Sequence, residues 1–343
     1  MKKKFALLLL LIVFLIGILT FVFMYNQNST EIPTDNSLDQ SSEQFDEDII
    51  TEIDPDQIEI DKEAAEEDTA TEQENEDDDS EQSSAAEKKE FYSPFSGEII
   101  DKHHLQKPLM VIIENSPISR PQAGLAEASI IYEVLVEGGI TRLMALYWDE
   151  IPEKIGPVRS ARPYMINITE EYRGLLLHAG ASPAGFSLLA ENVVDHLDQI
   201  TKGEYYWRTS DSKAPHNLYT GKKMLEDYLV KLPERKYEPR FSFQYISVVE
   251  PGMNKADIIK IPFLGKNKVI YKYDKNKNRY YRYHNSINNP HNVSNDKQLA
   301  AENILIQYVK TEVIDNVGRL EIELENRGKA MLIRDGIVVE GYW

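Results

Sequence analysis

The longest apolar run of the chain lies at its start, where Lys2, Lys3 and Lys4 precede an uncharged segment, residues 5–24. At 1.5 Å per residue, about twenty helical residues cross a bilayer core of about 30 Å. A cleaved secretory signal has a shorter apolar core of about 7–15 residues, so we expect a retained anchor. Positive charge stays inside, which predicts a single-pass membrane protein with a cytoplasmic N-terminus and extracytoplasmic folded domains.

Regular hydrophobic patterns begin near residue 91, where short apolar runs alternate with helical periodicity. The predicted strands are 109–113, 129–137, 140–148 and 174–178, and the predicted helices are 161–172, 183–192 and 220–232. This alternation predicts an α/β or α+β N-terminal domain with a mixed sheet.

One predicted hairpin has a specific register. Gly138 and Gly139 read as a two-residue turn, which would place Leu135 opposite Arg142 and so Arg142 diagonal to both Glu133 and Glu137. The other face of the hairpin, with Tyr132, Val134, Val136, Leu143, Ala145 and Tyr147, is the expected core face.

After about residue 236 the pattern becomes mostly that of strands, which predicts a smaller β-rich C-terminal domain. A short helix is expected only over 298–303. The predicted strands are 241–249, 268–273, 280–283, 303–310, 319–324, 330–334 and 337–342.

Charge separates these domains from what precedes them. Residues 31–90 contain 25 Asp and Glu against three Lys, whereas residues 91–343 contain 32 acidic and 32 basic residues. We therefore expect an anchor (1–25), a disordered acidic tether (26–90), and domains over 91–235 and 236–343. A neutral body gives no electrostatic reason to expect nucleic acid as a partner, since nucleic acid needs a concentrated basic face. The chain has no cysteine, which excludes disulfides, thiolate sites and a lipid-bearing cysteine.

The sharpest polar motif runs from Gly156 to Pro163 and contains Arg159, Ser160 and Arg162 at a predicted helix start. Free N–H groups at a helix start and guanidinium forks both suit phosphate or carboxylate groups. Alternatively, these arginines pair with Glu114, Glu133 or Glu137 and hold two elements together.

Two further motifs precede predicted helices. Ser182, after His178, is followed by Pro183, which has no N–H to offer an oxyanion, so we expect a helix N-cap rather than a nucleophile. His216 and Asn217 offer donors, an acceptor and a proton carrier, or they hold a loop. The similar triplet 290–292 is attributed to chance. No metal-ligand spacing or nucleotide loop is evident, so no cofactor is expected.

These motifs, in this order, resemble the YerB-like lipoproteins of Gram-positive bacteria over about residues 92–343. The resemblance implies an exported two-domain envelope protein of unassigned function, usually tethered through a lipidated cysteine that is absent here. The residues that match its polar motifs are Arg120, Glu133, Glu137, Arg142, Arg159, Ser160, Arg162, His178, Ser182, His216 and Asn217.

Three functions remain open. The first is an envelope protein that binds an anionic ligand through Arg142, Arg159 and Arg162 with His216 nearby. The second is an enzyme acting on wall polymers, with Glu133 or Glu137 and His216 as acid and base. The third is a module that binds an envelope protein; it predicts an exposed apolar patch and neutralised Arg/Glu pairs.

Overall fold

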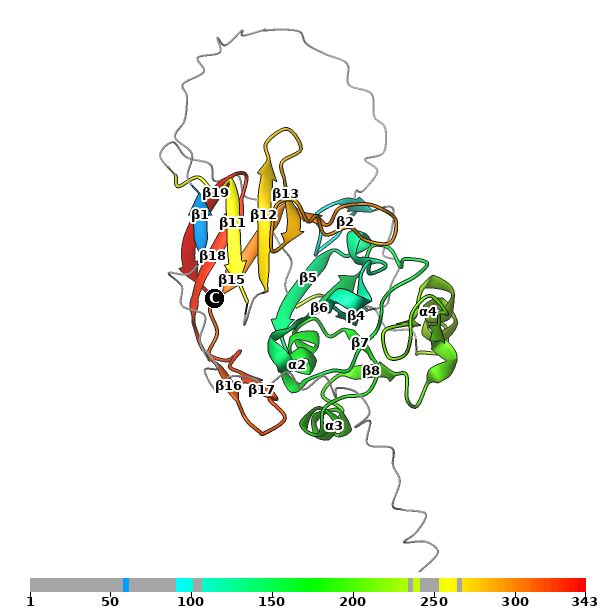
Figure 1. Ribbon diagram of the computed structural model, residues 1–343. Coiled ribbons are helices and arrows are strands. Elements are labelled where there is room, and N and C mark those ends of the chain that lie inside the picture. The colour runs from blue at the N-terminus through cyan, green and yellow to red at the C-terminus, as the bar shows by residue number, and fades with distance from the viewer. Residues whose placement is uncertain (1–57, 62–90, 101–106, 234–236, 241–252, 264–266) are drawn as a thin grey trace, which may run out of the picture. The chain divides into compact units, whose positions relative to one another are not determined.

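The computed structural model describes residues 58–61, 91–100, 107–233, 237–240, 253–263 and 267–343 (Figure 1). The predicted anchor and most of the predicted tether lie outside these ranges. Within them, no helix is both long and apolar enough to cross a membrane. The predicted fold class is confirmed, because a mixed sheet with helices is followed by a β-rich region.

The N-terminal region is built on a five-stranded mixed sheet in the order β5-β6-β4-β7-β8. Strands β5, β6 and β4 pair antiparallel, whereas β4, β7 and β8 pair parallel. Every residue of β4 and β6 is buried, so both faces of the central strands are covered, including the face that the sequence did not favour as core. The strands are β4 (Leu109–Glu114), β5 (Ile130–Leu135), β6 (Thr141–Tyr147), β7 (Leu175–His178) and β8 (Asp195–Asp198).

The predicted hairpin forms with a register shifted by one residue. Leu135 pairs with Thr141, and Arg142 pairs with Val134. The connection is a three-residue 3-10 turn, η4 (Glu137–Gly139), in which both glycines have positive φ. A one-residue shift moves each side chain to the other face. Arg142 therefore lies on the face opposite Glu133, which corrects the predicted diagonal contacts with that carboxylate.

A second chain segment enters the sheet where β4 and β7 separate. The N–H of Glu114 donates to Pro157 O, and the N–H of Arg159 donates to Ile112 O. On its other side, the N–H of Ala179 donates to Arg159 O. Residues 157–161 thus lie between the carboxyl end of β4 and the chain that leaves β7. In open α/β sheets, ligands bind at this edge, where the strand order reverses.

Three helices follow the predicted pattern with shorter bounds: α2 (Pro163–Glu171), α3 (Pro183–Ala190) and α4 (Lys222–Leu229). Both α2 and α3 begin with proline, whose fixed φ suits the first helical turn. The remaining short elements here are β2 (Phe91–Tyr92), β3 (Ile99–Ile100), β9 (Trp207–Arg208), β10 (Leu218–Tyr219), η2 (Pro117–Ser119), η3 (Leu125–Glu127) and η5 (Gly203–Tyr205).

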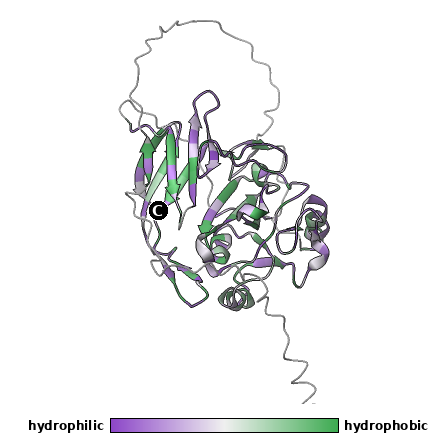
Figure 2. Cartoon of the chain, in the orientation of Figure 1, coloured by the Kyte–Doolittle hydropathy of each residue, from purple (hydrophilic) through white to green (hydrophobic). Residues whose placement is uncertain are grey.

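The C-terminal region contains a five-stranded antiparallel sheet, β1-β11-β12-β13-β14, in which β1 is Glu59–Asp61, and a three-stranded sheet, β15-β18-β19. Its strands carry most of its apolar residues (green in Figure 2). The bounds are β11 (Ile258–Pro262), β12 (Lys268–Asp274), β13 (Arg279–His284), β14 (Ala300–Ala301), β15 (Asn303–Gln307), β16 (Thr311–Val313), β17 (Leu320–Ile322), β18 (Lys329–Arg334) and β19 (Ile337–Tyr342).

Two predictions are corrected in this region, and a third lies outside the described residues. Residues 298–303 form no helix, because Ala300 and Ala301 pair with β13 as β14 and override local helix propensity. The predicted tether contains a strand, β1 (Glu59–Asp61), which pairs antiparallel with β11. The predicted strand 241–249 falls outside the described ranges.

Candidate functional site

Arg142 is a buried charged group on β6, at the edge where β4 ends. It is 6% exposed, and its Nη1 donates to Ser160 O at 2.6 Å. No carboxylate lies within ion-pair distance of it among the described residues. Burial, together with repulsion from Arg162 and Arg159, lowers the pKa of Arg142 to about 9. A buried cation among cations is stabilised by any anion that reaches it.

The two neighbouring arginines have carboxylate partners. Arg162 binds Glu137 through two hydrogen bonds of 2.6 and 2.7 Å and also reaches Ser160 Oγ at 3.3 Å. Burial raises the pKa of Glu137, but hydrogen bonds and attraction from Arg162 outweigh it and lower that pKa overall. Arg159 Nε lies 3.5 Å from Glu114 Oε2, and neither atom has a hydrogen bond. The predicted alternative of Arg/Glu pairing therefore describes Arg162 well and Arg159 only loosely.

Glu114 ends β4 and connects these arginines to His216. Its Oε1 accepts hydrogen bonds from His216 Nδ1 at 2.8 Å and from Ser116 Oγ at 2.6 Å. The Glu114 side chain is 4% exposed, whereas the His216 side chain is 23% exposed. The hydrogen-bond partner of His216 is thus Glu114, rather than Glu133 or Glu137. We name Arg142, Arg159, Arg162, Glu114, Glu137 and His216 the β4-edge cluster.

Three predicted site residues have contacts that hold the backbone in place. His178 is fully buried, with Nδ1 at 2.8 Å from Gly180 O and Nε2 at 3.0 Å from His196 Nδ1. Ser182 caps α3 by accepting a hydrogen bond from the N–H of Gly185, as the sequence predicted. Asn217 donates to Thr209 O and Ser212 O and accepts from Arg208. These contacts account for the three side chains without a ligand.

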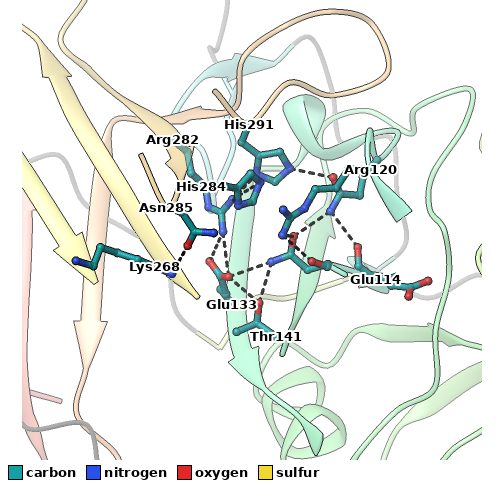
Figure 3. Close-up of polar contacts among 11 residues, drawn as sticks. Glu114, Arg120, Glu133, Thr141, Lys268, Arg282, His284, Asn285 and His291 are labelled. Carbon is teal, nitrogen blue, oxygen red and sulfur yellow. Dashed lines mark hydrogen bonds and ion pairs between the residues drawn. The ribbon is translucent and has the colours of Figure 1, made fainter. Parts of the chain in front are cut away.

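Glu133 belongs to a closed ring of hydrogen bonds that we name the Arg282 ring: Arg282, His291, Gln122, Asn115 and Glu133 (Figure 3). Arg282 Nη2 binds both carboxylate oxygens of Glu133, at 3.0 and 2.9 Å, and Arg282 Nη1 donates to His291 Nδ1. His291 Nε2 donates to Gln122 Oε1 at 2.9 Å, and Gln122 Nε2 donates to Asn115 Oδ1. Asn115 Nδ2 then donates to Glu133 Oε1, which closes the ring.

The ring requires an uncharged His291, since Nδ1 must accept from a guanidinium. Burial and the positive charge of Arg282 hold the pKa of His291 well below its usual value. The same two causes lower the pKa of His284, beside Arg282, to about 3. Arg120 lies close by and donates to Asn115 O at 2.8 Å. Arg120 and Glu133, both predicted site residues, therefore belong with the Arg282 ring rather than with the β4-edge cluster.

The sequence predicts Glu114 as a possible partner for arginine, and it assigns no role to the triplet that contains His291. Both residues are buried and hold other polar groups in place. The signal available for Glu114 was its position, since it is a carboxylate at the end of an otherwise apolar strand. Within the described ranges, no group of three or more potential metal ligands is present.

Two models of one protein family match successive parts of the chain. A family model described as "Protein of unknown function (DUF3048) N-terminal domain" matches residues 95–238. A second model, the C-terminal domain of the same family, matches residues 259–343. The two matches together cover more than half of the chain.

The chain is also similar in sequence to a bacterial protein and similar in structure to a solved crystal structure. The chain is 32% identical over 270 residues to a Bacillus subtilis protein named "Putative lipoprotein YerB", which covers 74% of this chain and 78% of the relative. It also resembles the crystal structure of YerB protein from Bacillus subtilis, with a TM-score of 0.65 and 29% identity, over 74% of this chain and 87% of that one.

Proposed function

The chain belongs to the DUF3048 family of unknown function, and from that premise we propose that it is an extracytoplasmic envelope protein that binds a phosphate- or carboxylate-bearing ligand at the β4-edge cluster. The observation that carries the proposal is the environment of Arg142, a buried guanidinium that donates a hydrogen bond to a carbonyl oxygen and has no carboxylate partner among the described residues. A buried guanidinium without a counter-ion is costly, and an anionic ligand would offset that cost.

Arg159 and Ser160 complete the binding groups. Arg159 keeps a loose 3.5 Å approach to Glu114, so its guanidinium can turn to a ligand without breaking a hydrogen bond at Nε. Ser160 and Arg162 border the start of α2, where backbone N–H groups favour negative charge. Arg162 itself is committed to Glu137 and positions this segment.

The location forms part of the proposal. The segment 5–24 would anchor the protein in the cell membrane, with the N-terminus cytoplasmic and the domains outside. Support comes from the lysines before that segment and from the relative named a lipoprotein. We place the domain boundary near residue 235, consistent with family matches that end at 238 and resume at 259.

Isothermal titration calorimetry of the full chain with inorganic phosphate, dimethyl phosphate and acetate tests the binding. We expect saturable binding of at least one probe. Arg142→Lys keeps the charge but loses the fork geometry, and Arg159→Met loses both. Since a hydrogen bond to a charged group contributes about 1.5–3 kcal/mol, each variant should weaken binding by about 10- to 100-fold.

Arg240 provides a matched control, because it forms an exposed pair with Glu170. Arg240→Gln should bind each probe as the wild type does. The absence of saturable binding to all three probes would contradict the proposal. Equal binding by the wild type, Arg142→Lys and Arg159→Met would do so as well.

A further inference from the structure

Glu114 and His216 have the geometry of a proton-transfer pair. Because an ionised carboxylate only accepts hydrogen bonds, the 2.8 Å contact assigns the proton of a neutral His216 to Nδ1. The lone pair then lies on Nε2, which has no hydrogen-bond partner among the described residues. A buried carboxylate that orients a partly exposed imidazole in this tautomer is the arrangement that prepares histidine as a general base.

Glu114 and His216 lie on the same face of the sheet as Arg142, the arginine that has no carboxylate partner among the described residues. Glu114 pairs directly with Arg142 across β4 and β6, and directly paired residues project to the same face. Val158 is bridged to Ile113, so Arg159, one residue further, lies on the face of Glu114, as their 3.5 Å approach requires. The groups proposed to bind an anion therefore lie beside the imidazole that could accept a proton.

The net charge of the β4-edge cluster favours a ligand with a single negative charge. Three guanidinium groups and two carboxylates leave one positive charge when His216 is neutral. One singly charged anion neutralises this cluster, and a phosphodiester carries a single charge. Its two non-bridging oxygens also suit a guanidinium fork.

We propose that the β4-edge cluster hydrolyses a phosphodiester, with His216 as the general base and Glu114 as the residue that positions it. This inference rests on the proposed function, since Arg142 and Arg159 must first bind the diester. It assigns His216 the proton-transfer role and Arg142 the role of balancing the charge that grows on the phosphoryl oxygens in the transition state.

In this hydrolysis, His216 transfers one proton from water to the leaving group. Water gives one proton to His216 Nε2 while its oxygen forms a bond to phosphorus, and the bond from phosphorus to one ester oxygen breaks. The imidazolium, stabilised by Glu114, returns that proton to the departing alkoxide. The products are an alcohol and a phosphomonoester that retains the second water proton until it ionises.

The test uses the full chain and bis(p-nitrophenyl) phosphate, with release of p-nitrophenolate as the readout of turnover and calorimetry with dimethyl phosphate as the readout of binding. His216→Asn is the decisive variant, because its amide nitrogen can take the place of Nδ1 and keep the bond to Glu114 while nothing replaces Nε2. Glu114→Gln changes the tautomer that is favoured and keeps the side-chain size.

We expect the wild type to release p-nitrophenolate. His216→Asn should lower the turnover rate by about 10²- to 10⁴-fold, much more than it weakens dimethyl phosphate binding, with an unchanged urea midpoint. Glu114→Gln should also lower the rate. If the wild type binds dimethyl phosphate but releases no p-nitrophenolate, or if His216→Asn reacts as fast as the wild type, the hydrolysis is refuted and the binding proposal stands. Absence of dimethyl phosphate binding by the wild type refutes this inference, whereas the binding proposal survives if phosphate or acetate binds.

Discussion

Replacing Arg282 by methionine should destabilise the protein strongly, because it removes the cation from a buried ion pair. The Arg282 side chain is 1% exposed, and it supplies both of its hydrogen bonds to Glu133 from Nη2. Glu133 would keep the donors of Thr141 at 2.7 Å and Asn115 at 3.1 Å. Loss of one partner of a buried pair costs about 3–5 kcal/mol. Since Glu133 is 14% exposed and keeps two donors, we expect about 3 kcal/mol.

A double-mutant cycle isolates the pair. Glu133→Gln removes the charge at nearly constant volume, and the double variant should recover part of the loss, because no unpaired charge is left buried. We expect a coupling energy of about 2 kcal/mol from urea unfolding of the full chain followed by tryptophan fluorescence. A coupling energy below about 0.5 kcal/mol would refute the view that the Arg282 ring acts as one unit.

Two further predictions concern stability. His284, with a folded pKa of about 3 against about 6.5 unfolded, contributes stability that is present above pH 6.5 and lost as pH falls toward 3. Between about pH 6 and about pH 4, His284→Asn should therefore reduce the slope of the unfolding free energy against pH by about 1.4 kcal/mol per pH unit. Urea titrations at several pH values measure this slope, and an unchanged slope would contradict the prediction. Ser182→Ala removes the N-cap of α3 and should lower the unfolding free energy by about 1 kcal/mol, whereas Ser187→Ala, on the exposed side of the same helix, should lower it less.

The elements with strong apolar periodicity were predictable from the sequence. Strand β4 is a continuous apolar run up to Glu114, and α2 and α3 begin with proline, so these local signals agree with the fold. Strand β8 was missed because Asp195, His196 and Asp198 surround a single leucine, and only pairing with β7 makes this segment a strand. Strand β1 was missed for a similar reason, since its three residues lie in an acidic segment.

The candidate site was predictable in its residue types and only in part in its contacts. The arginines around Ser160 were correctly placed near Glu114 and Glu137 as one of two alternatives. The hairpin register was wrong, because a three-residue 3-10 turn and a two-residue turn fit the same Gly-Gly sequence. The Arg282 ring joins Glu133 to a residue 149 positions later, and no local pattern reports such a contact.

Strand β1 is the first described element to bear a force that is applied to the N-terminal end of the chain. It pairs with β11 at only three positions and adds one ion pair, between Glu59 and Lys260 at 2.8 Å. A pull from the residues before β1 would load this edge of the C-terminal sheet before any load reached β2 across residues 62–90. Under such a force, the three residue pairs between β1 and β11 should separate before the six pairs between β12 and β13. Strand β1 would then detach while the rest of the C-terminal sheet stays folded.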